Sequence, residues 1–236
     1  MMRIPAGEFM MGAPEDEPDA FYREQPQHRV RVAEFFMGQT PVTQAQWRAV
    51  VRNSEPIDRE LKPDPSEFKG DDRPVEQVNW DDAQEFCRRL SALSKKDYRL
   101  PSEAQWEYAC RADTETAYHL GPILTKDVAN YGESVGQTTD VGTYPANRWG
   151  LYDMHGNVYE WCEDDWHVNY NGVPEDGSAW IITGKDNLNK IRRGGSWFDV
   201  PENCRSAFRD LNSRDFCLSD FSFRVCCVLP SILLRS

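Results

Sequence analysis

The sequence RRGGSW at residues 192–197 and the sequence FRV at residues 223–225 enclose the segment that decides how this chain is interpreted. Between these two ends the side chains follow neither the period of a helix nor the alternation of a strand. Such side chains do not predict a face that packs into a core. They predict a surface that a rigid frame displays, and therefore a protein whose role is recognition more than catalysis.

The predicted binding surface consists of the inserts between the two ends of this segment. If they are exposed together, the aromatic inserts would anchor a partner, and the acidic inserts would favour a basic one. The alternative is that half of these rings belong to the core, because folds rich in loops bury their aromatic side chains. The predicted ligand-binding residues are Phe198, Asp199, Val200, Phe208, Asp210, Leu211, Asn212, Ser213, Phe216, Leu218, Ser219 and Asp220.

Composition excludes several classes of function. The chain has 236 residues and a formal net charge of -12, which argues against nucleic acid as a partner because phosphates require a basic surface. No stretch approaches the roughly 18 apolar residues of a membrane span, and the N-terminus lacks the apolar centre of a signal peptide. With seven cysteines, an odd number, we expect free thiols and a cytoplasmic location.

Local signals predict three helices and little other regular structure. The first helix runs from Gln44 to about Val51 with Thr43 as N-cap, and the second reaches Ser94 from a cap at Asn79 or Asp81. The third follows Ser102, whose capping box Gln105 closes, and ends at Arg111. Strands are expected at 3–12 and 28–36, with short strands and long loops from residue 113 onward.

Two details of this interpretation concern burial. In the second helix, an apolar face is expected at Ala83, Phe86, Cys87, Leu90 and Leu93. The acidic run at residues 163–165 is expected to be a solvated loop. No composition change marks a linker, so one domain is expected over residues 1–236, with its variable segment at about 192–227.

Several blocks of sequence occur in the order of one known family. They are IPAGEFMMG at 4–12, PVT at 41–43, PVEQVNW at 74–80, RLPSEAQWEYA at 99–109, NRWGLYDMHGNVYEW at 147–161, RGGSW at 193–197 and FRV at 223–225. Together they resemble the formylglycine-generating enzyme (sulfatase-modifying factor) family. The resemblance implies an α+β, C-type-lectin-like fold, rich in loops, with two or three helices and small twisted antiparallel sheets.

The oxidases of this family bind Cu(I) with two cysteines, and the resemblance places these at residues 199 and 204. Here the second position is Cys204 but the first is Asp199. A carboxylate is a hard ligand that does not replace a thiolate at Cu(I), so no copper is expected. The alternative function is a copper-dependent oxidase that generates formylglycine on a protein cysteine, with Cys217 as second thiolate if folding brings it to Cys204.

The C-terminal segment also resembles the variable proteins of diversity-generating retroelements. These proteins share the fold, and adenine-directed mutagenesis of their asparagine codons cannot produce Lys, Glu, Gln, Met or Trp. None of the predicted binding residues belongs to that excluded set. The resemblance implies a non-catalytic protein that binds a protein or other macromolecule through diversified inserts, while Trp197, Cys204, Arg209 and Arg224 hold the backbone. A plain structural domain within a larger polypeptide is a further possibility.

The resemblance also implies a structural calcium ion at the sequence DMHGNVYE, residues 153–160. Its ligands would be the side chains of Asp153 and Glu160 and the carbonyl oxygens of Gly156 and Val158, since calcium prefers oxygen ligands. The alternative is a turn at Gly156 that leads into a strand without any metal.

Overall fold

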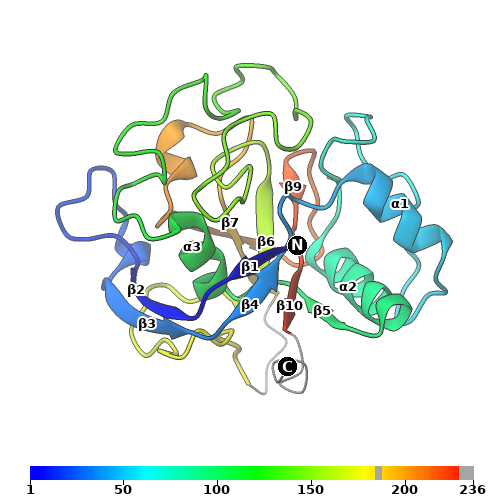
Figure 1. Ribbon diagram of the computed structural model, residues 1–236, viewed down its shortest axis with the longest axis horizontal. Coiled ribbons are helices and arrows are strands. Elements are labelled where there is room, and N and C mark those ends of the chain that lie inside the picture. The colour runs from blue at the N-terminus through cyan, green and yellow to red at the C-terminus, as the bar shows by residue number, and fades with distance from the viewer. Residues whose placement is uncertain (184–187, 229–236) are drawn as a thin grey trace.

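The computed structural model describes residues 1–183 and 188–228. Within them the fold is α+β: three α-helices, two short 3-10 helices and small sheets are joined by long loops (Figure 1). The predicted fold class is therefore confirmed. Residues 229–236 of the predicted domain lie outside the described residues.

The strands form three small sheets. The first sheet has the order β1 (Met2–Ile4), β4 (Phe35–Met37), β10 (Cys226–Val228) and β5 (Asp97–Arg99), so the two ends of the described chain meet in it. The second pairs β2 (Gly7–Met11) with β3 (His28–Val32), and the third has the order β8 (Arg209–Ser213), β7 (Asn189–Arg193), β6 (Tyr159–Asp165) and β9 (Phe221–Ser222). All pairs are antiparallel except β6 and β9, which run parallel.

The three helices begin and end close to where their capping signals predict. They are α1 (Gln44–Arg52), α2 (Trp80–Ser94) and α3 (Glu103–Arg111), and each begins with a capping box. The N-cap of α2 is Asn79, not Asp81. Among the helices in the described part of the chain, none is both long and apolar enough to cross a lipid bilayer.

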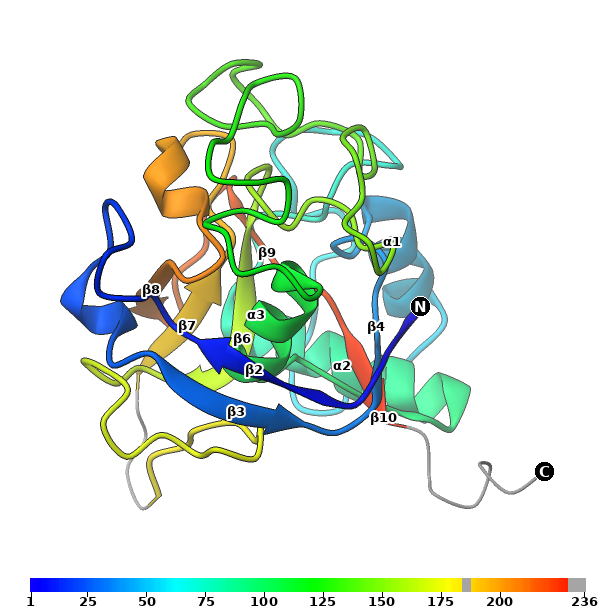
Figure 2. The ribbon, with the colours of Figure 1, turned by 60° about the vertical axis from the view of Figure 1, so that its left-hand side comes forward.

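The loops between α3 and β6 form one end of the molecule. Residues 112–158 contain no α-helix and no strand, and Figures 1 and 2 show them beside the 3-10 helix η2 (Pro201–Cys204). The other 3-10 helix, η1 (Tyr22–Glu24), lies near β2 and β3 in both views. The η2 part of the C-terminal segment and the long loops therefore share one end of the fold.

Large rings supply much of the core, as the sequence suggests. Trp47 of α1 stacks on Phe86 of α2 with ring centroids 5.3 Å apart, and Phe223 meets Phe86 edge-on at the same distance. Trp161 of β6 is buried and donates its indole N–H to the Val78 carbonyl oxygen at 3.1 Å. These contacts pack α1 and α2 against the C-terminal strands.

Two expectations about burial are wrong. Leu93, at the end of α2, is 45% exposed, because the helix projects beyond the sheet it covers while Ala83, Phe86 and Cys87 are buried. The acidic run at residues 163–165 belongs to β6, and two of its carboxylates are buried. Asp164 accepts hydrogen bonds from the backbone amides of Glu103 and Trp180, at 2.7 and 2.8 Å.

Three buried arginines join the C-terminal segment to the rest of the fold. Arg209 binds Glu103 of α3 through two hydrogen bonds of 2.7 and 2.6 Å. Arg193 pairs with Glu107, one turn further along α3. Arg224 binds Glu160 of β6 at 2.6 and 2.7 Å.

We call these three residues, Arg193, Arg209 and Arg224, the arginine frame. All three are completely buried. Arg209 and Arg224 pair with their carboxylates through two hydrogen bonds each, and such bidentate pairing fixes both the distance and the orientation of the guanidinium group. Removal of one partner from such a pair leaves an uncompensated buried charge, which costs several kcal/mol. The frame therefore fixes the backbone at both ends of the segment and at its centre.

Candidate ligand-binding face

The C-terminal segment leaves β7 through a turn that requires glycine. Gly195 has a φ of 69°, and a Cβ atom at this position would lie 2.5 Å from the sulfur of Cys204. A side chain here would thus be strained and would collide with a buried group. Close packing of Cys204 against this turn fixes where the inserts begin.

Four large apolar inserts are exposed on this segment. Phe198 is 60% exposed, Val200 53%, Phe216 46% and Leu218 43%. Leu211 lies on β8 opposite Ile191 and is half-buried. The inserts Asn212, Ser213 and Ser219 are also half-buried. Most predicted binding residues are therefore exposed or half-buried.

The prediction that Phe208 contacts a ligand is wrong, because this side chain is buried. It is 1% exposed and lies just before β8, where its ring meets Phe21 edge-on at 5.8 Å. The guanidinium carbon of Arg23 lies 4.9 Å from the centre of the Phe208 ring. The loop that carries Phe21 and Arg23 thus covers Phe208, and a ligand has no access to it.

The acidic inserts are less free than the apolar ones. The carboxylate of Asp199 accepts hydrogen bonds from Ser196 at 2.6 Å, Asn203 at 2.8 Å and the Tyr159 hydroxyl at 3.1 Å. It therefore holds the turn into η2 more than it offers charge to a ligand.

Asp210 and Asp220 share one cation. Asp210 pairs with Arg192 at 2.6 Å, and the guanidinium of Arg192 lies over the rings of Tyr159 and Phe221 at 4.0 and 4.3 Å. Burial raises the pKa of the half-buried Asp220 above its usual value, and Arg192 opposes this shift. Arg192 is thus the cation that compensates both carboxylates beneath the face.

Residues outside the segment border the exposed inserts. Trp197 is half-buried, and Phe68 meets its ring edge-on at 5.5 Å. The backbone amide of Glu133 donates to the Trp197 carbonyl oxygen at 2.8 Å, and that of Gln77 donates to Leu218 at 3.0 Å. The sequence does not predict a role for Phe68, since this residue lies in a charged, Pro-containing loop with no periodic signal.

The residues present do not fit a Cu(I) site of two thiolates. Cys204 is buried against Tyr118 and other side chains of one small core cluster, and burial raises its thiol pKa well above the usual value. Cys217 is half-buried in different surroundings. Burial raises the pKa of its thiol, the Asp82 carboxylate raises it further, and Lys62 opposes the shift. Position 199, the other predicted copper position, carries the hydrogen-bonded carboxylate of Asp199.

The four predicted calcium ligands also fit a metal ion poorly. Both carboxylate oxygens of Glu160 bind Arg224, and one of them also accepts the indole N–H of Trp106 at 3.0 Å. The Gly156 carbonyl oxygen accepts a hydrogen bond from the Val158 amide. Of the two predicted carboxylate ligands, only Asp153 has a buried carboxylate oxygen without a hydrogen-bond partner. Burial raises the pKa of Asp153 to about 6.

Glu160 thus serves the arginine frame, because a guanidinium at 2.6 Å and a divalent cation would repel each other at the same oxygens. Across residues 1–183 and 188–228, no group of three or more His, Cys, Asp or Glu side chains is arranged to hold a metal ion. Calcium binding stays a prediction from the sequence.

Comparison with known proteins gives a match along the described chain. A model of the sulfatase-modifying factor enzyme 1-like domain matches residues 1–228. The chain belongs to the sulfatase-modifying factor family. The family resemblance predicted from the seven sequence blocks is therefore confirmed.

Similar proteins carry names of different kinds. A serine/threonine-protein kinase pkn1 from Chlamydia caviae is 32% identical over 95% of this chain and 37% of its own length. The formylglycine-generating enzyme of Bos taurus is 27% identical over 95% of this chain and 73% of that enzyme. The chain thus spans little more than a third of the kinase that it matches.

Two solved structures are similar over nearly the whole chain. PvdO from Pseudomonas aeruginosa has a TM-score of 0.85 and 33% identity, and the match covers 96% of this chain and 93% of PvdO. Treponema denticola variable protein 1 has a TM-score of 0.81 and 27% identity, and the match covers 96% of this chain and 94% of that protein. The scaffold is thus shared by proteins named as enzymes and by one named as a variable protein.

Proposed function

We propose that this chain is a non-catalytic binding protein whose C-terminal inserts contact a protein or other macromolecule. The observation that carries this proposal is the exposure of Phe198, Val200, Phe216 and Leu218 on a segment whose ends are fixed by the arginine frame. Buried aromatic anchors dominate protein interfaces, so exposed ones on a rigid backbone suit that role. The similarity to a variable protein supports the same function.

The resemblance to variable proteins implies that the inserts are diversified. Deep sequencing of the coding region in a population grown from one cell tests this part of the proposal. If the inserts are diversified, substitutions will concentrate at codons of exposed inserts such as Phe198 and Leu218. We expect few at Phe208, because a polar residue there would be buried beneath Phe21. Substitutions spread evenly along the gene, or found equally at the codons of the arginine frame, would contradict diversification.

The second candidate is a copper-dependent oxidase, which the cysteine at position 204 and the similarity to formylglycine-generating enzyme favour. Titration of the reduced protein with Cu(I) separates the two candidates. Our proposal predicts no tight one-to-one binding that depends on Cys204. Tight binding that is lost in Cys204→Ala but kept in Cys110→Ala, another buried thiol, would favour the oxidase instead.

A further inference from the structure

The exposed inserts do not form their surface alone, because fixed rings continue it. Phe68 packs edge-on against Trp197 at 5.5 Å, and Trp197 packs edge-on against Phe198 at 5.7 Å. Only Phe198 of these three rings is a predicted insert. A row of rings from two distant parts of the chain therefore leads from a fixed loop to the variable segment.

The loop that carries Phe68 is held rigidly from below. Glu76 is completely buried, and one of its carboxylate oxygens accepts the Phe68 backbone amide at 2.8 Å. The Phe68 carbonyl oxygen accepts the side-chain amide of Gln44 at 2.7 Å. The Glu76 backbone amide donates to the Ser66 hydroxyl at 3.0 Å. Such preorganisation lowers the entropy cost of binding.

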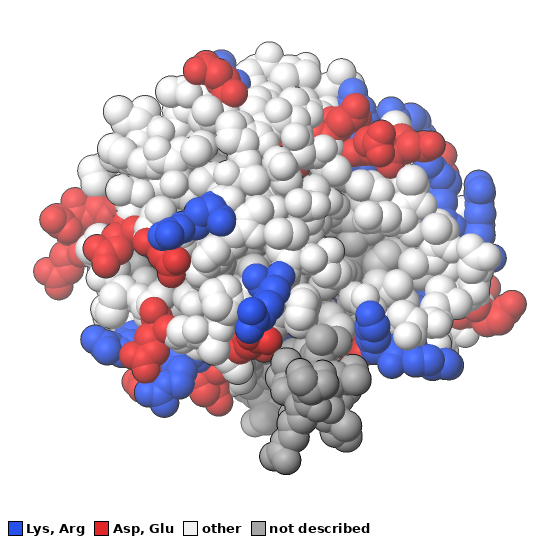
Figure 3. Space-filling model, in the orientation of Figure 1, with Lys and Arg blue, Asp and Glu red and all other residues white. Residues whose placement is uncertain are grey.

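Two exposed acidic residues adjoin this row of rings through the backbone. Glu67 is exposed and precedes Phe68 in the chain. Glu133 is also exposed, and its backbone amide donates a hydrogen bond to the Trp197 carbonyl oxygen. Two nearby cations already have carboxylate partners, since Arg192 binds Asp210 at 2.6 Å and Lys69 lies 3.0 Å from Asp64. Figure 3 shows Asp and Glu side chains over the loops beside α1, with Lys and Arg side chains among them.

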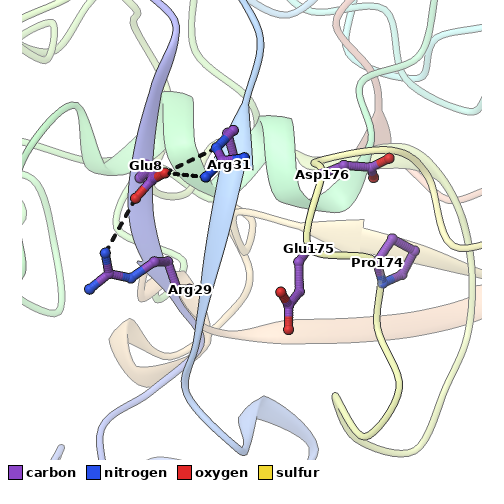
Figure 4. A pocket seen from close by; sticks show the side chains of 6 residues that line it. All are labelled: Glu8, Arg29, Arg31, Pro174, Glu175 and Asp176. Atoms are coloured by element: carbon purple, nitrogen blue, oxygen red, sulfur yellow. Dashed lines mark hydrogen bonds and ion pairs between the residues drawn. The ribbon is translucent and has the colours of Figure 1, made fainter.

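A second charged surface differs in this respect. A hollow of about 420 Å³ lies at β2 and β3. In it Glu8 binds Arg29 at 3.3 Å and Arg31 at 2.9 Å (Figure 4). Both guanidinium groups in this hollow pair with Glu8, and Figures 1 and 2 place this hairpin away from η2 and β9. The exposed Glu175 in this hollow provides a matched control residue.

We propose that Phe68, Trp197, Glu67 and Glu133 complete the binding face, and that its ligand is a cationic polypeptide segment with a large apolar side chain. This inference rests on the proposed function. The apolar side chain would lie on the row of rings, where aromatic contact contributes most of the energy. Lysine and arginine side chains of the ligand would face the carboxylates, which also accelerate encounter at low salt.

Selection from a phage-displayed library of random dodecapeptides tests the proposal. We expect the whole chain to enrich peptides that combine net positive charge with an aromatic or large aliphatic residue. Synthetic copies of the enriched peptides should bind Phe68→Ser about tenfold more weakly, as truncation of an interface ring does. Glu67→Lys combined with Glu133→Lys should abolish the preference for basic peptides, while Glu175→Lys should leave it unchanged.

Two outcomes separate this inference from the proposed function. If Phe198→Ser and Leu218→Ser weaken peptide binding but Phe68→Ser and the charge reversals do not, the inserts bind alone and this inference is wrong. If binding is indifferent to Phe198 and Leu218, the proposed function itself is wrong. The melting temperature of Phe68→Ser shows whether its loss of binding reflects a loss of folding, and Phe68→Leu, which keeps an apolar side chain in the loop, is the comparison variant.

Discussion

The arginine frame and the exposed inserts differ in nearly every physical property, although they alternate along one stretch of chain. Arg193, Arg209 and Arg224 are completely buried, and each binds a carboxylate from α3 or β6. Phe198 and Leu218 project from the same segment into solvent. The difference teaches that stability and recognition can be assigned to different side chains of one segment, so that one set changes while the other stays.

The largest expected effect is on the frame. Arg224→Ala leaves the carboxylate of Glu160 buried without its partner, and we expect a loss of about 3–5 kcal/mol in the free energy of unfolding. Urea denaturation followed by circular dichroism measures this loss.

The matched control is Arg31→Ala, which removes a guanidinium that is mostly exposed and pairs with Glu8. Exposed ion pairs contribute about 0–1 kcal/mol, so this variant should unfold close to the original chain. Equal losses in the two variants would break the distinction between the frame and surface ion pairs.

The second prediction compares two phenylalanines of the C-terminal segment, one buried and one exposed. Phe208→Ala should lower the free energy of unfolding by about 3–5 kcal/mol, because it opens a cavity beneath Phe21. Phe198→Ala should change it by only about 0.5 kcal/mol or less, since the ring is exposed. Urea midpoints of both variants measure the difference. A neutral Phe208→Ala would show that the covering loop repacks and that position 208 belongs with the inserts.

The third prediction concerns the buried carboxyl beneath Phe68. Burial raises the pKa of Glu76 to about 7, above the roughly 4.3 of an unfolded chain. Because this pKa is raised in the folded state, the contribution of the Glu76 carboxyl to the free energy of unfolding is fully present below about pH 4 and is lost as the pH rises through about 7. Glu76→Gln cannot ionise, so its stability relative to the original chain should increase by about 1–3 kcal/mol between pH 4 and pH 8.

Thermal unfolding across this pH range provides the measurement for Glu76→Gln. The exposed neighbour Glu67→Gln serves as control and should show no comparable trend. A difference between Glu76→Gln and the original chain that is independent of pH would mean that the carboxyl of Glu76 is hydrated and its loop less rigid than the contacts imply.

Sequence reasoning worked where the physical cause is local. The caps at Thr43, Asn79 and Ser102 predict the helix starts, since a capping box depends on residues three positions apart. The carboxylate partner of Arg193 could not be predicted in this way, because Arg193 and Glu107 are 86 positions apart in the chain.

The missed parts of the face depend on contacts between distant segments. Phe208 and Phe198 are the same residue type in the same segment, so the sequence does not distinguish them. Only the contact with Phe21 makes Phe208 a core residue. Phe68 lies in a loop with no periodic pattern, and only its contact with Trp197 assigns it to the face. Glu160 fits a calcium ligand by sequence until Arg224, 64 positions away, occupies its carboxylate.

Simultaneous replacement of Phe198, Val200, Phe216 and Leu218 by serine tests the separation of frame and inserts most directly. Scanning calorimetry should find the melting temperature within about 4 °C of the original chain, which corresponds to about 1 kcal/mol for a protein of this size. A fall of more than about 10 °C would show that these side chains hold the fold together, and would contradict their assignment to a freely variable binding face.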